Sequence, residues 1–430
     1  MKHARPFVCL AALAALFVGA NASADVIAIQ NAEVHTLGPA GTLAHGTVIV
    51  RNGRIEAVGA DLAVPAGATV IDGSGKVLTP GVIAPLTQLG LKEIDGVEET
   101  NDVGSKQPRF SAGLDVTDGL NPRSALLPVN RIEGVTTAIT APGSRQGGSL
   151  IAGQGAVISL AGTHAAEGSF VLKPRVAVFA QIGENSAPLT GGTRPATLAA
   201  LREALEEAKP NGLRSGAGLW RAAQLGPFDV AALKPVLAGQ TPLVLYANRA
   251  SDITAAVKLA DEYGIRLIIS GAAEAHLVAK TLVEHRVPVL IDPTLDLPAR
   301  FETLHGRPDA AQLLLRAGVR FAFIDDSEFA THNARNLRQL AGIAVSYGLS
   351  KDAALAAITR APAEIYGLSE DRGSIERGKV ADLVLWDGDP LEVTSAATQV
   401  FIAGAAMPMI SRQTLLRDRY LQRLKAKTTP

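Results

Sequence analysis

The chain has 430 residues, with 41 basic and 41 acidic side chains, so its formal charge balances. Aromatic residues make up 4% of it and no basic patch stands out, which argues against nucleic-acid binding. A chain of this length holds two ordinary domains or one large barrel with an appendage.

The N-terminus has the pattern of a secretory signal. Lys2 and Arg5 precede an apolar stretch at 7–19, and Ala22-Ser23-Ala24 supplies small residues before Asp25. The apolar stretch is shorter than the roughly 20 residues of a membrane-spanning helix, and no later segment is long and apolar enough to span. We therefore expect a signal peptide at 1–24 and a periplasmic or secreted protein.

Cleavage after residue 24 removes Cys9, the only cysteine, and leaves 39 basic and 41 acidic side chains. The mature chain then has no thiol for a disulfide, a thiolate metal site or a cysteine nucleophile.

Short strands come first in the mature chain. The segments 26–30, 47–51, 54–58 and 69–71 are rich in β-forming residues, and Asn52-Gly53 between two of them predicts a hairpin turn. From residue 81 to about 367, short apolar strands alternate with helical stretches rich in Ala, Leu and Glu, which indicates βαβ units and a parallel sheet. Gly264 and Gly318 are expected to end helices in the left-handed conformation.

Strands return near the C-terminus, at 381–386 and 400–402, with the turn-rich sequence Asp387-Gly388-Asp389-Pro390 between them. A chain that begins and ends in strands suggests one small sheet closed by both ends. The stretch 411–427 is polar, basic and helical, which is typical of a surface or an interface.

Several motifs resemble those of the amidohydrolase superfamily, and most closely those of its exported, imidazolonepropionase-like branch. Those near the N-terminus are Gly53-Arg54-Ile55, Val58-Gly59, Val70-Ile71-Asp72-Gly73 and Leu78-Thr79-Pro80-Gly81. The stretch 373–386, Gly-Ser-Ile-Glu-Arg-Gly-Lys-Val-Ala-Asp-Leu-Val-Leu-Trp, resembles the C-terminal signature, and Gly134-Val135-Thr136-Thr137 and the segment 359–365 resemble barrel segments. These matches bracket nearly all of the mature chain in the family's order.

The resemblance implies a fold and a division of the chain. The fold class is α/β: a (β/α)₈ barrel at 81–375 with a small composite β-sandwich built from 25–80 and 376–410. A C-terminal helix or tail follows at 411–430. The family hydrolyses C–N or related bonds with a divalent ion that activates water. Its ligands follow the barrel strands: a His-x-His after the first, histidines after the fifth and sixth, and an aspartate after the eighth that also shuttles protons.

This sequence departs from the family at the ligand positions. The first-strand motif, laid on Pro80-Gly81, puts Leu86 and Gln88 where the two histidines belong. The fifth-strand histidine falls at Tyr246 and the sixth near Ser270. At the eighth position the spacing favours Asp326, with Asp325 as the alternative. We therefore expect no metal of the family type and no cofactor, because a catalytic zinc site wants about three nitrogen or oxygen protein ligands.

Other residues are candidates for binding a substrate. Arg249, soon after Tyr246, could grip a carboxylate at the barrel mouth. His332 follows Asp326 by six residues and is either a ligand contact or a solvated loop histidine. The candidate site thus has Asp326 as the catalytic base, and its substrate-binding residues are Gln88, Tyr246, Arg249, Ser270 and His332.

Two functions fit this pattern. The first is an amidohydrolase-type enzyme that acts on C–N bonds of a small amide or peptide-like compound without the usual metal centre. The second is a non-catalytic relative that binds a ligand or pairs with an active, histidine-bearing paralogue. The expected partner is a small molecule. A homo-oligomer and a paralogue pair are the two forms of assembly considered, and fold alone cannot choose between the functions.

Overall fold

The computed structural model describes residues 26–109, 111–210, 225–295, 299–326 and 333–428. The expected signal peptide and His332 lie outside these ranges, so both remain predictions. None of the helices within them combines the length and apolar character needed to cross a bilayer.

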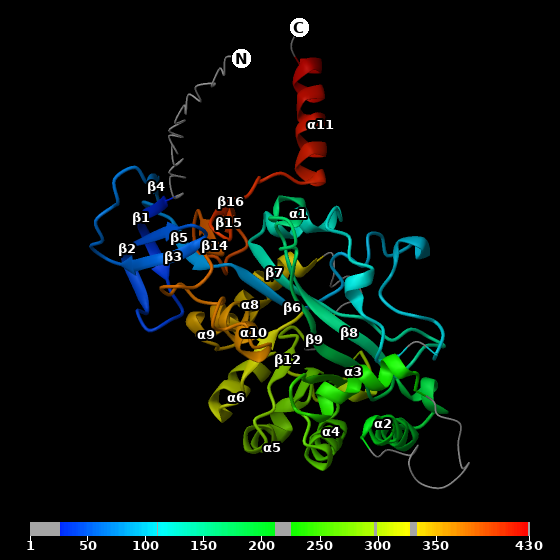
Figure 1. The fold of residues 1–430 in the computed structure, drawn as a ribbon. Helices are drawn as coiled ribbons and strands as arrows, with labels where there is room; N and C mark the ends of the chain where they lie inside the picture. The colour runs from blue at the N-terminus through cyan, green and yellow to red at the C-terminus, as the bar shows by residue number, and fades with distance from the viewer. Residues whose placement is uncertain (1–25, 110, 211–224, 296–298, 327–332, 429–430) are drawn as a thin grey trace, which may run out of the picture.

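Two eight-stranded sheets organise the described chain (Figure 1). The strands of the first sheet are β1 (Val26–His35), β2 (Thr42–Arg51), β3 (Arg54–Gly59), β4 (Thr69–Asp72), β5 (Val77–Pro80), β14 (Leu383–Trp386), β15 (Ala397–Ile402) and β16 (Ala405–Ala406). The strands of the second sheet are β6 (Val82–Thr87), β7 (Val135–Thr140), β8 (Ile151–Ser159), β9 (Val171–Gln181), β10 (Leu243–Ala247), β11 (Leu267–Gly271), β12 (Val289–Ile291) and β13 (Phe321–Phe323).

Helices and short turns fill the connections. The α-helices are α1 (Leu126–Arg131), α2 (Arg194–Ala208), α3 (Pro227–Leu237), α4 (Ala250–Tyr263), α5 (Ala279–Glu284), α6 (Ala310–Ala317), α8 (Leu337–Ser346), α9 (Lys351–Ala357), α10 (Arg360–Ile365) and α11 (Arg412–Thr428). The 3₁₀ turns are η1 (Glu98–Thr100), η2 (Val116–Asp118), η3 (Gly162–His164), η4 (Ala187–Thr190), η5 (Ala275–Val278), η6 (Phe301–Thr303) and η7 (Ala334–Asn336).

The first sheet joins the two ends of the chain, as expected. Its order is β16-β15-β14-β5-β1-β2-β3, with β4 beside β1, and β14 runs antiparallel to β5. Trp386 on β14 donates its indole N–H to Thr79 Oγ1 at 2.9 Å inside this junction. The strands form one hydrogen-bonded sheet, so a two-layer sandwich is not confirmed, and the domain boundaries remain a prediction.

Local turn chemistry explains several boundaries. Asn52 and Gly53 both have positive φ, 50° and 77°, which is the type I′ turn that the right-handed twist of β2 and β3 favours. Gly264 and Gly318 cap α4 and α6 in the left-handed conformation, which confirms both predicted helix ends.

The second sheet is a nearly closed barrel with the order β13-β12-β11-β10-β9-β8-β7-β6. Helices α2 to α6 lie around its outside (Figure 1). A regular (β/α)₈ barrel, with every strand parallel, is not what the chain forms, because β8 runs antiparallel to both β7 and β9. The connection between β7 and β8 is about ten residues and rich in glycine, too short for the crossover that parallel strands need.

Apolar side chains fill the barrel. Ile83, Ile139, Val244, Ile268 and Leu290 belong to one buried cluster, drawn from successive strands. Residues around Tyr366, after α10, belong to the same cluster. The interior is therefore a packed core, and any ligand must bind at an end of the barrel.

Candidate active site

A cavity of about 550 Å³ opens at the carboxyl ends of the barrel strands. Gln88 follows β6, Ser144 follows β7, Gln181 ends β9, and Asp325 with Asp326 follow β13. Barrel enzymes place their chemistry at this end because the loops after the strands converge there. The size suits a small molecule.

Four of the residues expected from the sequence meet in this cavity. Gln88, Tyr246, Ser270 and Asp326 all line it. Tyr246 on β10 is the register neighbour of Ser270 on β11, which confirms that they belong to adjacent strand ends.

Asp326 is a largely buried carboxyl group in direct contact with Tyr246. Tyr246 donates its hydroxyl to Asp326 Oδ2 at 2.9 Å, and the backbone N–H of Asp326 donates to Asp292 Oδ2 at 3.1 Å. Burial raises the pKa of Asp326 to about 6, although the Tyr246 hydrogen bond and the Arg300 guanidinium oppose the rise. At neutral pH the carboxylate is therefore ionised yet holds a proton more tightly than an exposed aspartate, which suits a general base.

The direction of the Tyr246 hydrogen bond follows from its neighbours. Asn248 Oδ1 accepts the backbone N–H of Ala273 at 3.2 Å, so Asn248 Nδ2 faces the Tyr246 oxygen at 2.9 Å and donates to it. Arg300 Nη1 lies 3.4 Å from the same oxygen. With these donors around it, the Tyr246 hydroxyl gives its own proton to Asp326. Burial and Asp326 raise the pKa of Tyr246 well above its ordinary value, so the phenol stays protonated.

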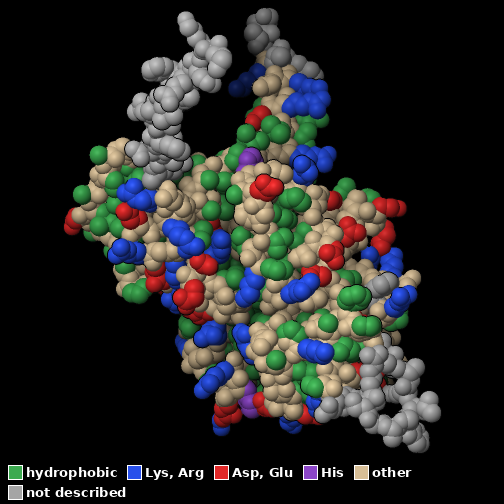
Figure 2. All heavy atoms as spheres, viewed as in Figure 1, with side chains coloured by type: hydrophobic (Ala, Val, Ile, Leu, Met, Phe, Trp, Pro, Cys, Tyr) green, Lys and Arg blue, Asp and Glu red, His purple; other side chains and the backbone are tan. Residues whose placement is uncertain are grey.

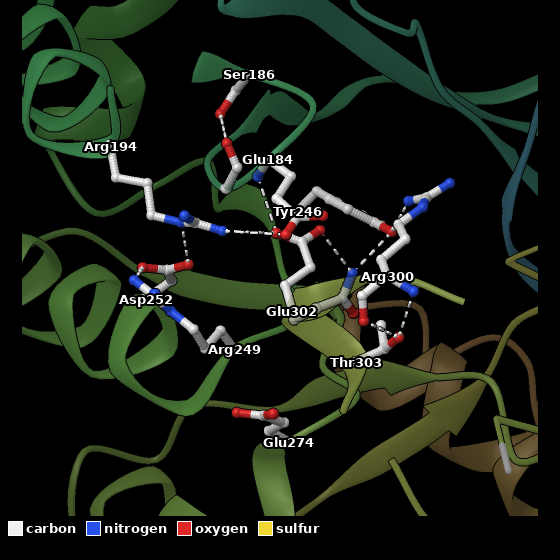
Figure 3. A network of polar contacts seen from close by, with 12 residues as sticks. Glu184, Ser186, Arg194, Tyr246, Arg249, Asp252, Glu274, Arg300, Glu302 and Thr303 are labelled. Atoms are coloured by element: carbon white, nitrogen blue, oxygen red, sulfur yellow. Dashed lines mark hydrogen bonds and ion pairs between the residues drawn. The ribbon is translucent and has the colours of Figure 1, made fainter. Parts of the chain in front are cut away.

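A buried network continues from Asn248 to Glu302 and Arg194, which Figure 3 shows. Glu302, 1% exposed, accepts from Asn248 Nδ2 at 3.3 Å and from the Glu184 backbone N–H at 2.8 Å. Arg194 lies 3.5 Å from Glu302 and 3.0 Å from Asp252. The network fixes Asn248 and, through it, the Tyr246 hydroxyl.

Arg249 does not line the cavity, contrary to the expectation from sequence. It precedes α4, and its guanidinium forms an ion pair with Asp252 at 2.8 Å, three residues along the chain (Figure 3). The i,i+3 spacing on a helix puts these two side chains on one face. The Arg249 guanidinium, which was expected to bind a substrate carboxylate, is therefore paired with the carboxylate of Asp252 instead.

Several residues near the cavity were missed by the sequence reasoning. Asp292 directly follows β12 in Val-Leu-Ile-Asp, the same strand-then-aspartate pattern as at Asp325, and that pattern could have revealed it. Arg300 lies in the connection after β12 and belongs to no recognisable motif. Lys92 and Asp95 line the cavity from the loop after β6 and form an ion pair.

The residues that the resemblance puts at the family's ligand positions do not fit a catalytic zinc or related ion. Leu86 has no donor atom, and Gln88, Tyr246 and Ser270 offer neutral oxygens. Within the described ranges, no group of three or more His, Cys, Asp or Glu side chains is arranged to hold a metal ion.

The fold and the position of the cavity define a barrel protein whose candidate site lies at the carboxyl ends of the strands. Residues 256–410 match the model of the amidohydrolase family. The chain is 29% identical over 393 residues to "Amidohydrolase tasK" of Hapsidospora irregularis, a match that covers 84% of this chain and 40% of that protein. It is 32% identical over 154 residues to an imidazolonepropionase of Rhizobium meliloti (strain 1021), covering 34% of this chain and 35% of that protein.

A solved structure, an amidohydrolase from Thermotoga maritima MSB8, has 27% sequence identity and a TM-score of 0.79. That comparison covers 90% of this chain and all of the Thermotoga chain. The chain spans well under half the length of the two curated relatives named above. Sequence and fold together relate it to the amidohydrolase family, with homologues named amidohydrolase and imidazolonepropionase.

Proposed function

We propose that this protein hydrolyses a C–N bond in a small amide or peptide-like molecule, without the metal centre of the family. The observation that carries this proposal is the buried carboxyl of Asp326, inside the cavity and hydrogen-bonded to Tyr246. A base of raised pKa in a partly apolar cavity suits general-base hydrolysis.

The reaction would proceed on the residues of the chain. Asp326 takes a proton from a water molecule as the water oxygen attacks the amide carbonyl. The side-chain amide of Gln88 and the hydroxyl of Ser270, both in the cavity wall, are donors that can stabilise the developing oxyanion. When the C–N bond breaks, Asp326 returns the proton to the leaving nitrogen.

The test is Asp326→Asn, which keeps the shape and removes the base. With a panel of N-acyl amino acids, dipeptides and small lactams, amine release should fall about 100- to 10,000-fold in the variant. Wild-type activity should rise as the pH passes about 6, because the base is then ionised. Asp309→Asn, at a surface carboxyl paired with Arg307, is the matched control and should keep full activity. Full activity in the Asp326 variant would remove Asp326 from the mechanism.

A non-catalytic role is the second candidate, and the residues at the family's ligand positions favour it. Leu86, Gln88, Tyr246 and Ser270 leave the cavity wall without an imidazole at those positions. A protein of this kind would bind its small molecule, alone or paired with an active paralogue. In the same panel it would show ligand-induced thermal stabilisation with no amine release in the wild type.

A further inference from the structure

Arg300 places a cation beside the reactive carboxyl. Its Nη1 lies 3.4 Å from the Tyr246 hydroxyl oxygen, and the same hydroxyl donates to Asp326 at 2.9 Å. One phenol group therefore joins the guanidinium and the carboxylate. A group bound by Arg300 next to Tyr246 therefore lies on the side of the phenol that faces the proposed base.

The segment that carries Arg300 is anchored in the protein. Its backbone N–H donates to Thr303 Oγ1 at 3.3 Å, and the Thr303 hydroxyl donates to the Arg300 carbonyl at 3.1 Å. Glu302, between them, is buried in the network with Asn248 and the Glu184 backbone (Figure 3). Gly183 leaves room for this anchor, because a Cβ there would lie 2.5 Å from Glu302 Oε2. Arg300 itself is exposed, so a fixed stem presents its side chain to solvent.

Neighbouring arginines each pair with a carboxylate, whereas Arg300 has no such partner among the described residues. Arg194 and Arg249 both pair with Asp252, and Arg307 pairs with Asp309. Across the described ranges, no carboxylate forms an ion pair with Arg300, and the Tyr246 oxygen is the contact its side chain makes. A guanidinium has five N–H donors in a planar fork that matches a carboxylate, so most of its donors are left for a ligand.

We propose that Arg300 binds the carboxylate of the substrate, and that the substrates are N-acyl amino acids or peptides with a free carboxylate beside the scissile amide. This inference rests on the proposed hydrolase function. In such molecules a single carbon separates the carboxylate from the amide nitrogen. A carboxylate held on Arg300 therefore sets the amide against Asp326 and Tyr246. We therefore assign to Arg300 the contact with the substrate carboxylate that the sequence had suggested for Arg249.

An alternative role for Arg300 predicts a different experimental result. If Arg300 acted only as a counter-ion for Asp326, its loss from a chain that already carries Asp326→Asn would leave the binding of acids and amides unchanged. The other groups that face Asp326 are Asp292 after β12, Asp325 on its own segment and Tyr246 on β10. These groups are the same for both ligands, so a difference between acid and amide on loss of Arg300 isolates the carboxylate contact.

The experiment compares N-acetyl-L-amino acids with the matching N-acetyl-L-amino acid amides. Their binding is measured by calorimetry on the full chain carrying Asp326→Asn, which holds ligand without turnover, and on the same chain with Arg300→Gln added. The acids should lose roughly 10- to 100-fold in affinity on loss of Arg300, and the amides should change less than about twofold. Arg300→Lys should restore part of the affinity, and Arg307→Gln, at an exposed arginine further along the same connection, should change neither ligand.

The outcomes separate this inference from the proposed function. Acid-specific binding that depends on Arg300, without amine release by the wild type, supports the inference and counts against the hydrolase. Amine release with equal preference for acids and amides overturns the carboxylate subsite. No change for either ligand assigns Arg300 to a counter-ion role, and equal losses for both assign it to a structural role; either result, or no binding by any acid of the series, contradicts the proposal.

Discussion

The burial of Asp326 lowers the stability of the fold at any pH where its carboxyl is ionised. The pKa of its carboxyl is about 6 in the folded chain, against an ordinary value of 3.8, because burial disfavours the charge. The folded state therefore binds this proton more tightly than the unfolded state does. Stability falls as the pH rises from about 4 to about 6, and the loss is complete above that range.

Asp326→Asn should therefore stabilise the protein at alkaline pH. The asparagine oxygen can still accept the Tyr246 hydroxyl, while the cost of a buried charge disappears. We expect the free energy of unfolding at pH 8 to rise by on the order of 2 kcal/mol, and the gain to vanish near pH 4. Urea unfolding at several pH values measures this. A constant difference between variant and wild type across that range would show that Asp326 titrates normally.

The site residues that could be predicted are those fixed by strand register. Gln88, Tyr246, Ser270 and Asp326 each follow from counting along a strand to its carboxyl end, and all four line the cavity. The prediction that Arg249 faces the cavity was wrong, because its ion pair with Asp252 on α4 sets the direction of its side chain. That pairing was visible as an i,i+3 spacing.

Arg300 could not be found in the same way. It reaches Tyr246 from a connection without periodicity, and its position depends on Glu302 and Asn248, which are far apart in sequence. Such placement is a property of tertiary packing and leaves no local pattern.

At the scale of elements, turn residues were the reliable guide. Asn52-Gly53 and the capping glycines 264 and 318 act within a few residues, so their sequence determines their structure. The direction of β8 could not be predicted in this way. A strand that is buried on both faces has the same sequence pattern whether its neighbours are parallel or antiparallel. The short glycine-rich connection before it was the available clue.

The composite sheet predicts the effect of a truncation. Deleting residues from 373 onward removes β14 to β16 and leaves β5 without its antiparallel partner. It also removes Leu383, Leu385 and Phe401 from the core that Ile29 and Leu78 share. Each buried side chain of this size contributes about 1.5–3 kcal/mol, so the remainder should be insoluble or unfolded.

The matched control for this truncation removes only the last helix, from residue 412 onward. Leu415, Leu416, Tyr420 and Leu421 on α11 are exposed, and the helix projects from the body of the molecule (Figures 1 and 2). That variant should stay soluble with an unchanged melting temperature. A soluble, monomeric and cooperatively folded chain after the longer deletion would indicate that the two ends form separate domains.

In the molecule as a whole, the packed core and the candidate site lie in different parts of the barrel. The barrel interior is packed with aliphatic side chains, and the sheet built from both chain ends holds the first barrel strand, since the Gly81 backbone N–H donates to the Asp382 carbonyl at 2.8 Å. The cavity at the opposite ends of the strands is then free to vary its side chains at little cost to the fold. An intact barrel is therefore compatible with the neutral side chains of Gln88, Tyr246 and Ser270 in the cavity wall.

This arrangement leads to a prediction for the whole chain: protein purified without chelator should hold no stoichiometric zinc, nickel or manganese. Gln88, Tyr246 and Ser270 supply only neutral oxygens at the ligand positions, and such ions need stronger donors. Elemental analysis should find far less than one ion per chain, and dialysis against a chelator should leave both the melting temperature and any amine release unchanged. A melting temperature that falls on dialysis, with one tightly held ion per chain beforehand, would overturn this prediction and make Asp325, Asp326 and His332 the first candidate ligands to substitute.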